Sequence, residues 1–374
     1  MKTNSITTTS FKGYDARPLK GFLMNSNPFG IARELKAIGD KEGFKIYSII
    51  DGVVLKDQIN PASYDTFNIW VQDMWTIAKN SLLSVINDRT ASKIKQKLNL
   101  VDNKAQLDLK NKSDIFSKNK HISGGNLFIV KGDQGDEVIV GSDELNKFDP
   151  TEIMAMYSVN KVTIIPQMDF HIDLSIRPLD NKRILLADDI TTLNVLKKGE
   201  KKLEKFLSSL TEEEKENYGI QSLAFKNLIE EFKDNIEKNK YASSALVEQT
   251  LKNSGYEVIK VPGRVYESYT IRKNPSLVSV CNYMNANVTY NRDGKLIYIT
   301  NKSPIEDILF LTPQLSEKIG FSFEQEFIKS LSPYIEKEHI YFIEGGDGFV
   351  KDQMLTFYGG GIHCVSMEIP EEMK

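Results

Sequence analysis

The chain has 374 residues, 40% of them apolar and 26% charged, and a formal net charge of −3. These values are ordinary for a globular protein that buries a sizeable core, and they exclude disorder over the whole length. They also give no general attraction to phosphate backbones or anionic lipid, so neither nucleic acid nor a membrane is an expected partner.

Cysteine content and the length of apolar runs bear on where the protein works. The chain has two cysteines, Cys281 and Cys364, which excludes a disulfide framework and favours a reducing compartment. No apolar run reaches the roughly 18 residues of a transmembrane helix, and residues 1–13 lack the apolar stretch of a signal peptide. We therefore expect a cytoplasmic location by default, with export by a route that leaves no such signal still open.

Short apolar, β-rich runs alternate with helical patterns along the chain. In the first part of the chain the sequence predicts a helix at Ile31–Ile38, a strand at Phe44–Ile50 and a surface loop at Asp102–Lys120. Four strands are predicted next, at Leu127–Val130, Val138–Val140, Val162–Ile165 and Ile184–Ala187. Three helices follow: one that begins with the capping box Thr211–Glu214, an amphipathic one at Leu223–Ile236 and one at Ala242–Ser254. The last predicted strands are Tyr256–Val261, Leu296–Ile299, Ile308–Leu311 and Ile340–Ile343. This alternation predicts a mixed α/β protein.

The segment from Lys197 to Lys240 is dense in lysine and glutamate, as a solvated helical face would be. No linker rich in proline or serine divides the chain. We therefore expect residues 1–374 to form one domain, with a Lys/Glu-rich helical segment at about 197–254.

Few catalytic signatures are possible in a chain with four histidines and two cysteines. There is no CxxC, HExxH, GxxxxGK[ST] or GxSxG, and no Cys/His spacing suits a zinc site. What remains is Cys364, which follows three glycines within Tyr358–Ser366. Glycines allow a tight turn and a close approach of substrate, so Cys364 is either a nucleophile at the mouth of a cleft or a small core thiol. Cys281, in an apolar setting without glycines, is predicted to be a core thiol.

A second candidate is the segment Met168–Leu174, which contains His171 and Asp173. In an extended segment these two side chains point to the same face. A carboxylate beside an imidazole raises its basicity, as a general acid or base requires. A His-x-Asp pair is also common in proteins without such a role.

The third candidate is Asp73, which lies between the two tryptophans of the chain, Trp70 and Trp75. An acid so placed is either a hydrogen-bonded core carboxylate or a ligand for a cation that lies against an aromatic wall.

Taken in order, Asp73, His171–Asp173 and Cys364 resemble the motifs of the guanidino-group-modifying (pentein) superfamily, in which an aspartate and a His-x-Asp pair precede a cysteine near the C-terminus. The glycine run before Cys364 resembles the nucleophile segment of that superfamily. Asn282–Tyr290, with three asparagines before a predicted strand, is similar to its late asparagine-rich segment. The resemblance implies a pseudo-fivefold symmetric α/β propeller of repeated ββαβ modules, with the site on its axis.

Within this superfamily the motifs most resemble the catalytic domain of peptidylarginine deiminases. Trp70–Asp73 is similar to their Trp-Ile-Gln-Asp, and Ser123–Leu127, which contains Asn126, is similar to their Phe-Gly-Asn-Leu segment. Two features depart from them. Arg177, six residues after His171, resembles agmatine deiminases, and the residues that follow Asp73 are not acidic, which argues against the calcium activation of the animal enzymes. No cofactor is required by the sequence, and no metal ligand set is expected.

The resemblance assigns roles to these residues. Cys364 would attack the guanidinium carbon, and His171 would protonate the departing ammonia and then activate a water molecule. Asp73 and Asp173 would bind the planar cation through charge-assisted hydrogen bonds. Trp70, Asn126 and Arg177 would contact the substrate. His363 would face away from the site, because neighbours in an extended strand point to opposite faces.

Three functions are therefore weighed. The first is a protein-arginine deiminase that converts arginine side chains of a protein or peptide to citrulline. The second is a small-molecule deiminase or amidinotransferase that acts on agmatine or free arginine. The third is a catalytically inactive arginine-binding scaffold, which the Cys, His and two Asp residues argue against, since binding alone needs no thiol.

Overall fold

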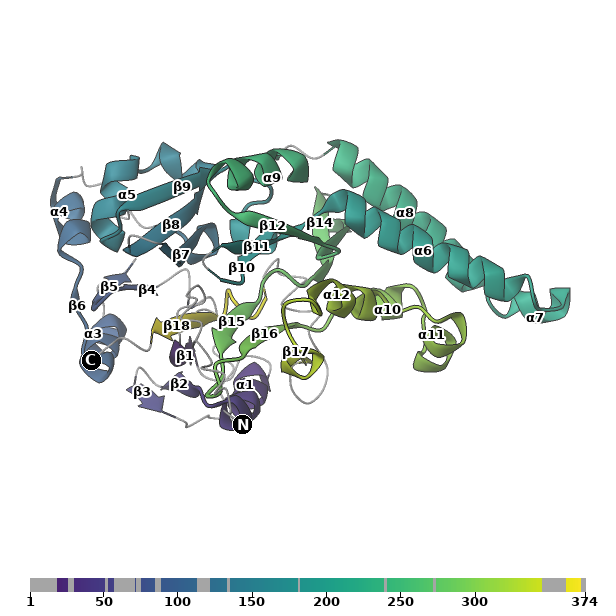
Figure 1. Cartoon of the computed structure of the whole chain (residues 1–374), viewed down its shortest axis with the longest axis horizontal. Helices are drawn as coiled ribbons and strands as arrows, with labels where there is room; N and C mark the ends of the chain where they lie inside the picture. Colours follow the sequence, from purple (N-terminus) through teal and green to yellow (C-terminus); the bar gives the residue numbers. More distant parts are fainter. Residues whose placement is uncertain are drawn as a thin grey trace, which may run out of the picture.

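The computed structural model describes residues 19–25, 30–50, 53–56, 71, 75–84, 89–112, 122–132, 135–180, 182–238, 241–271, 274–344 and 361–370. Helices and strands alternate along them, and the fold is mixed α/β, as the sequence predicts (Figure 1).

One strand arrangement recurs five times among the described residues. In each set, two neighbouring strands pair antiparallel and a third strand lies parallel to the second. The sets are β18 (Ser366–Pro370), β1 (Leu19–Asn25) and β2 (Lys45–Ile50); β4 (Trp75–Ala78), β5 (Ser81–Ser84) and β6 (Val101–Asp102); β7 (Leu127–Gly132), β8 (Gly135–Gly141) and β9 (Lys161–Ile165); β10 (Ile176–Pro178), β11 (Arg183–Ala187) and β12 (Glu257–Val261); and β15 (Asn287–Tyr290), β16 (Leu296–Asn301) and β17 (Ile340–Ile343).

Helical segments connect the second strand of each set to the third, because two parallel neighbours need a crossover connection. These connections are α1 (Ile31–Glu42), α3 (Arg89–Leu98), α5 (Pro150–Tyr157), the four helices α6 (Asp189–Leu207), α7 (Glu212–Glu216), α8 (Gly219–Lys238) and α9 (Ser244–Asn253), and the three helices α10 (Ile305–Ile308), α11 (Pro313–Ile319) and α12 (Phe323–Leu331). The set β18–β1–β2 thus joins the two ends of the chain, and β3 (Val53–Lys56) extends it by one strand.

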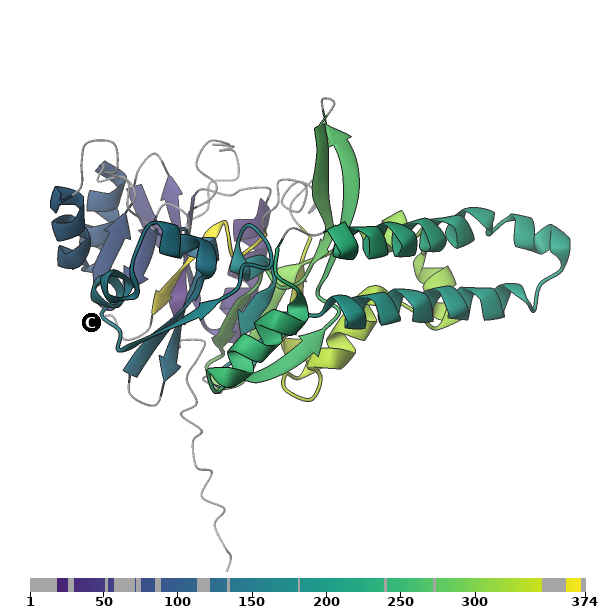
Figure 2. The same ribbon diagram turned by 90° about the horizontal axis from the view of Figure 1, so that it is seen from above.

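Two insertions stand out from this repeated pattern. Helices α6 and α8 run side by side away from the body of the protein, with α7 at their far end (Figure 1). The hairpin β13 (Arg264–Ile271) and β14 (Asn274–Asn282) projects separately (Figure 2). The capping box predicted at Thr211 is present, since its side chain accepts from Glu214 N and Glu214 reaches back to Thr211 N. The Lys/Glu-rich segment is helical, as predicted.

The core consists of several buried clusters, of which the largest lies under α6, α8 and α12. Phe225, Leu228, Ile229 and Phe232 of the amphipathic pattern predicted in α8 are buried there. No helix in the described ranges combines the length and apolarity needed to cross a bilayer.

Eight of the nine predicted strands have a counterpart, and one is wrong. Residues Ile308–Leu311 lie at the end of α10 and in the turn after it, where Phe310 has a left-handed φ of 52°. The loop predicted at Asp102–Lys120 is also wrong in part, because α4 (Lys104–Lys112) occupies half of it. Both segments are short and mixed in character, so local pattern does not distinguish strand, helix and loop there.

Candidate active site

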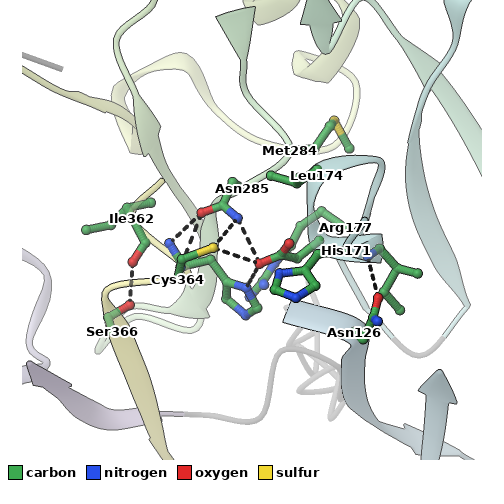
Figure 3. A network of polar contacts seen from close by, with 12 residues as sticks. Asn126, His171, Leu174, Arg177, Met284, Asn285, Ile362, Cys364 and Ser366 are labelled. Atoms are coloured by element: carbon green, nitrogen blue, oxygen red, sulfur yellow. Dashed lines mark hydrogen bonds and ion pairs between the residues drawn. The ribbon is translucent and has the colours of Figure 1, made fainter. Parts of the chain in front are cut away.

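Three segments that are distant in the sequence bring polar side chains together (Figure 3). Cys364 lies in the turn before β18, Asp173 in the short 3₁₀ helix Ile172–Leu174, and Asn285 in the connection from β14 to β15. Cys364 is 5% exposed, and Asp173 and Asn285 are fully buried. The structure thus brings two of the predicted site residues, Cys364 and Asp173, into contact.

Asn285 is the hub of this cluster, and the sequence analysis did not single it out. Its Nδ2 donates to Asp173 Oδ2 at 2.8 Å and to Cys364 Sγ at 3.0 Å. Its Oδ1 accepts from the backbone N–H of His363 at 3.0 Å and of Cys364 at 3.3 Å. One buried amide therefore fixes the carboxylate, the sulfur and the turn that carries the sulfur.

The glycine that begins this turn is needed for the same contact. A Cβ on Gly361 would lie 2.7 Å from Asn285 Oδ1, which is closer than real Cβ atoms approach a neighbour. Gly361 thus allows the backbone to pack directly on the Asn285 amide.

Asp173 accepts hydrogen bonds from three directions at one oxygen atom. Besides Asn285, Cys364 Sγ donates to Oδ2 at 3.4 Å, and His363 Nδ1 lies 2.9 Å from the same atom. A buried carboxylate needs such partners, since an unpaired charge in a protein interior is costly. The thiol and the carboxylate are therefore direct neighbours, as a site that binds a cation beside a nucleophile requires.

The prediction that His363 faces away from the site is wrong. Residues 362–365 form a turn and not an extended strand, so the side chains of His363 and Cys364 both reach Asp173. His363 is 2% exposed, and its ring stacks on Phe128 with centroids 5.4 Å apart. Burial, with the positive charge of Arg177 and the neighbouring His171, holds the pKa of His363 well below its usual value. His363 is therefore neutral, with the proton on Nδ1 donated to Asp173.

His171 precedes the 3₁₀ helix, so the segment is not extended through Asp173, and the condition for a shared face of His171 and Asp173 is not met. Its Nε2 lies 2.9 Å from Ser123 Oγ, and its ring lies against the backbone of Gly125, where a Cβ would come within 2.7 Å of the ring carbon Cγ. His171 is near enough to His363 to lower the pKa of that residue. The turn at Gly124–Asn126 thus fixes the position of the imidazole, which lies in the same group of side chains as Cys364 and Asn285 (Figure 3).

Asn126 holds the backbone that carries His171 and Asp173. Its Oδ1 accepts from Ile172 N at 3.1 Å and from Gln167 Nε2 at 2.6 Å, and its Nδ2 donates to Glu144 Oε1 at 3.0 Å. These contacts fix the 3₁₀ helix, and a contact of Asn126 with substrate stays a prediction.

Arg177 lies close to this cluster and is 3% exposed. Its Nη2 donates to Glu368 Oε1 at 2.6 Å, and its guanidinium lies over the ring of Phe128, 5.0 Å from the centroid. Its predicted contact with substrate also stays a prediction. Asp73 and Trp70 lie outside the described residues.

Cys281 is fully buried in the apolar core, as predicted. Burial raises the pKa of its thiol far above the ordinary value, so it is not a competing nucleophile. Within the part of the chain that the structure describes, no group of three His, Cys, Asp or Glu side chains is placed to hold a metal ion.

Neither a family model nor a curated protein matches the chain. Solved structures are similar over nearly the whole length. Agmatine deiminase from C. jejuni covers 97% of this chain and 99% of its own at 14% identity and a TM-score of 0.47. A substrate-bound variant of that enzyme is 13% identical to this chain, with a TM-score of 0.46. An amidinotransferase from Microseira wollei, of the saxitoxin biosynthetic pathway, covers 96% and 97% at 11% identity and a TM-score of 0.43.

Both names fit the guanidino-group-modifying superfamily that the sequence motifs resemble. At these TM-scores and identities the likeness carries no argument about the reaction. The case for a function therefore rests on the side chains described above.

Proposed function

We propose that this protein is a cysteine-dependent enzyme that hydrolyses the guanidinium group of a small molecule, with Cys364 as nucleophile. The observation that carries the proposal is the contact of Cys364 Sγ with Asp173 Oδ2, in a buried cluster that His171 lies near (Figure 3). A guanidinium is planar and permanently charged, so it needs a carboxylate at its edge and a soft nucleophile at its carbon. Asp173 supplies the carboxylate and Cys364 the sulfur, and the two side chains are in contact.

The first step forms a bond from sulfur to the guanidinium carbon. In the free enzyme the Cys364 thiol donates to Asp173, and a bound cation would take over that carboxylate and stabilise the thiolate. Asn285 Nδ2 remains a hydrogen-bond donor to the sulfur during this change. The thiol proton passes to His171 as the sulfur–carbon bond forms. The carbon–nitrogen bond then breaks, and His171 gives that proton to the leaving ammonia.

The second step hydrolyses the S-alkylthiouronium intermediate. His171 accepts a proton from water as the water oxygen bonds to the carbon. The carbon–sulfur bond then breaks, His171 returns that proton to the sulfur, and the ureido product loses its remaining proton to solvent as it is released. The Ser123 hydroxyl, 2.9 Å from His171 Nε2, would hold the ring in orientation. The predicted roles of Asp73 and Trp70, as a second carboxylate and a wall for the substrate stem, belong to the same proposal.

Burial favours a small substrate over an arginine in a folded protein. Cys364, Asp173 and His363 are each 5% exposed or less, so the reacting carbon has to enter a closed space. The small-molecule hypothesis is therefore preferred to the protein-arginine deiminase that the Trp70–Asp73 and Ser123–Leu127 motifs resemble. Agmatine, free arginine and related guanidino compounds are the substrates to test first.

The repeated strand pattern motivates a further part of this proposal. We infer that the five three-stranded sets close around one axis as a pseudo-fivefold propeller, in a single domain, with Cys364 at its centre. The shared topology of the sets supports this, including the set that joins the two ends of the chain.

The test is a substrate panel. Agmatine, free arginine and an arginine-containing peptide are incubated with the protein, and ammonia and the ureido product are measured for each. We expect both products in equal amounts from a small guanidino compound. Turnover of the peptide alone would favour the protein-arginine deiminase. Release of the parent amine without ammonia, dependent on an added acceptor amine, would identify an amidinotransferase.

The matched variants are Cys364→Ser and Cys281→Ser. The first should lose all turnover, and the second should keep it, because Cys281 is buried in the core away from Asp173. Activity that survives in Cys364→Ser would refute the mechanism, and absence of any product in the whole panel would favour the scaffold hypothesis.

A further inference from the structure

The base of the hairpin β13–β14 contacts the segments that carry the proposed reacting groups, while its outer part projects from the body of the protein (Figure 2). Arg264, at the start of β13, lies directly opposite Asn282, at the end of β14. The two residues are 3% and 1% exposed, and no step proposed above uses either of them. A guanidinium and an amide buried this deeply need hydrogen-bond partners, so their partners show what they hold in place.

Arg264 binds both ends of the loop Met168–Ser175, in which two of the proposed site residues lie. Its Nη1 donates to Met168 O at 3.3 Å and to Asp169 Oδ2 at 3.2 Å at one end of the loop, and to Ser175 Oγ at 2.8 Å at the other. A guanidinium presents its donors in a rigid planar fork, so groups that bind it are held at fixed positions. One side chain thus fixes where this loop begins and where it ends.

Asn282 binds the same loop and also the turn that leads to the hub of the cluster. Its Nδ2 donates to Leu174 O at 3.4 Å. Its Oδ1 accepts from Met284 N at 3.0 Å and from Asn285 N at 3.1 Å. The base of the hairpin therefore holds two segments against each other, the loop that carries the imidazole and carboxylate and the connection that carries the amide beside the sulfur.

The charge of Arg264 also has a role in the fold. Its guanidinium pairs with Asp169 at 3.2 Å and with Asp189, the first residue of α6, at 3.5 Å. Burial raises the pKa of Asp189, and the positive charge of Arg264 opposes that rise. A neutral residue at this position would leave buried carboxylates without this countercharge, which is costly. A variant that tests positioning therefore has to keep the charge.

We propose that Arg264 and Asn282 form a clamp at the base of the hairpin, which positions His171 and Asp173 relative to the sulfur of Cys364. Both are positioning residues, since they act through the loop and through the connection to β15. The inference rests on the proposed function, because its effect is assigned to turnover. Loosening the clamp lowers kcat, since reacting groups have to be held to within a fraction of an ångström.

Two substitutions in the full chain test the clamp. Arg264→Lys keeps the positive charge beside Asp169 and Asp189, but an ammonium lacks the planar fork that reaches both ends of the loop. Ser175→Ala removes one hydrogen-bond acceptor from one end of the loop and leaves both carboxylates in place. On the best guanidino substrate, kcat per folded molecule should fall at least about tenfold in each variant. KM should stay nearly constant, because Asp173 keeps its contacts with Asn285 and His363 and still binds the cation.

The matched control is Arg183→Lys. Arg183 also pairs with an aspartate, Asp180, but it lies at the start of β11, whereas Ser175 bonds to Ala187 at the other end of that strand. This variant should keep both kcat and KM. A structural arginine without a positioning role would show the same result at position 264, with reduced stability and unchanged kcat.

Hydrogen exchange provides a readout that needs no turnover. The amides of Leu174 and Ser175 should exchange faster in Ser175→Ala and Arg264→Lys than in the wild type or in Arg183→Lys, because the loop opens locally when an end is released. If Arg264→Lys fails to fold, Ser175→Ala decides. A wild type without turnover on any guanidino compound would refute the proposed function, and exchange would still test the clamp. An active wild type whose kcat is kept in the variants, or exchange that does not change, would overturn the clamp.

Discussion

Replacing Asn285 with alanine should separate the catalytic cluster from the rest of the fold. The amide donates to Asp173 and Cys364 Sγ and accepts from two backbone N–H groups in the turn that carries the sulfur. In Asn285→Ala the sulfur and the carboxylate lose their shared donor, and two buried N–H groups lose their acceptor. The geometry between nucleophile and carboxylate is then no longer fixed.

The magnitudes follow from these contacts. Each buried N–H left without an acceptor costs about 1–3 kcal/mol, so the free energy of unfolding should fall by about 2–6 kcal/mol. Displacement of reacting groups by about 1 Å costs on the order of 100-fold in rate, so kcat should fall by at least about that factor. The assays are ammonia release on the best guanidino substrate and denaturant unfolding.

Asn291→Ala is the matched control. Asn291 Nδ2 also donates to a carboxylate, that of Glu42, and its Oδ1 also accepts from two backbone N–H groups, those of Asp293 and Lys295. Its side chain lies in the β15–β16 turn and away from Cys364. We expect a loss of stability in both variants and a loss of kcat in Asn285→Ala alone. Equal activity in the two variants would refute the role assigned to Asn285.

Three further predictions concern neighbours of this cluster. Gly125→Ala should reduce kcat about 100-fold with a smaller loss of stability, because the added Cβ would displace the His171 ring. Gly219→Ala, with nothing near its Cβ, should leave kcat and stability unchanged. Full activity in Gly125→Ala would show that catalysis does not depend on the position of the His171 ring. Because the pKa of the His363 side chain is lowered in the folded protein, this side chain binds a proton below about pH 6.5 in the unfolded state but not in the folded state. The free energy of unfolding should therefore fall by about 1.4 kcal/mol per pH unit as the pH drops below that value, and His363→Gln should flatten this slope. An unchanged slope would contradict a buried neutral imidazole. The thiol of Cys281, with a raised pKa, should resist alkylation by iodoacetamide until the protein unfolds. Peptide mass spectrometry can follow this alkylation, and a Cys281 that reacts in the folded protein would contradict the prediction.

Much of the fold could be predicted from residue pattern, because buried strands and amphipathic helices leave a local signal. The helix with Phe225 and Phe232 on its buried face, and the capping box at Thr211, are two examples. Strands such as β4, β5 and β10 were missed, since they have only three or four residues and no clear alternation. Their pairing comes from tertiary contacts, which local pattern does not contain.

The candidate site could be predicted in part. Residue type and chain order were enough to select Cys364, His171 and Asp173, because few residues can act as nucleophile or acid–base group. The conformations around them could not be predicted, since a 3₁₀ turn after His171 and a turn at His363 depend on contacts with distant segments. Asn285 was missed for the same reason. The asparagine-rich segment was noticed, but only the fold shows which of its asparagines faces the sulfur.

The central claim is that Cys364 is a nucleophile beside a carboxylate that binds a planar cation. It is tested most directly by comparing alkylation by chloroacetamidine, a planar cation, with alkylation by chloroacetamide, its neutral analogue, followed by peptide mass spectrometry. The account predicts that the cation modifies Cys364 alone, at least about tenfold faster than the neutral reagent, since one charge-assisted hydrogen bond is worth about that factor. Equal rates for the two reagents, or a Cys364 that reacts with neither, would contradict it.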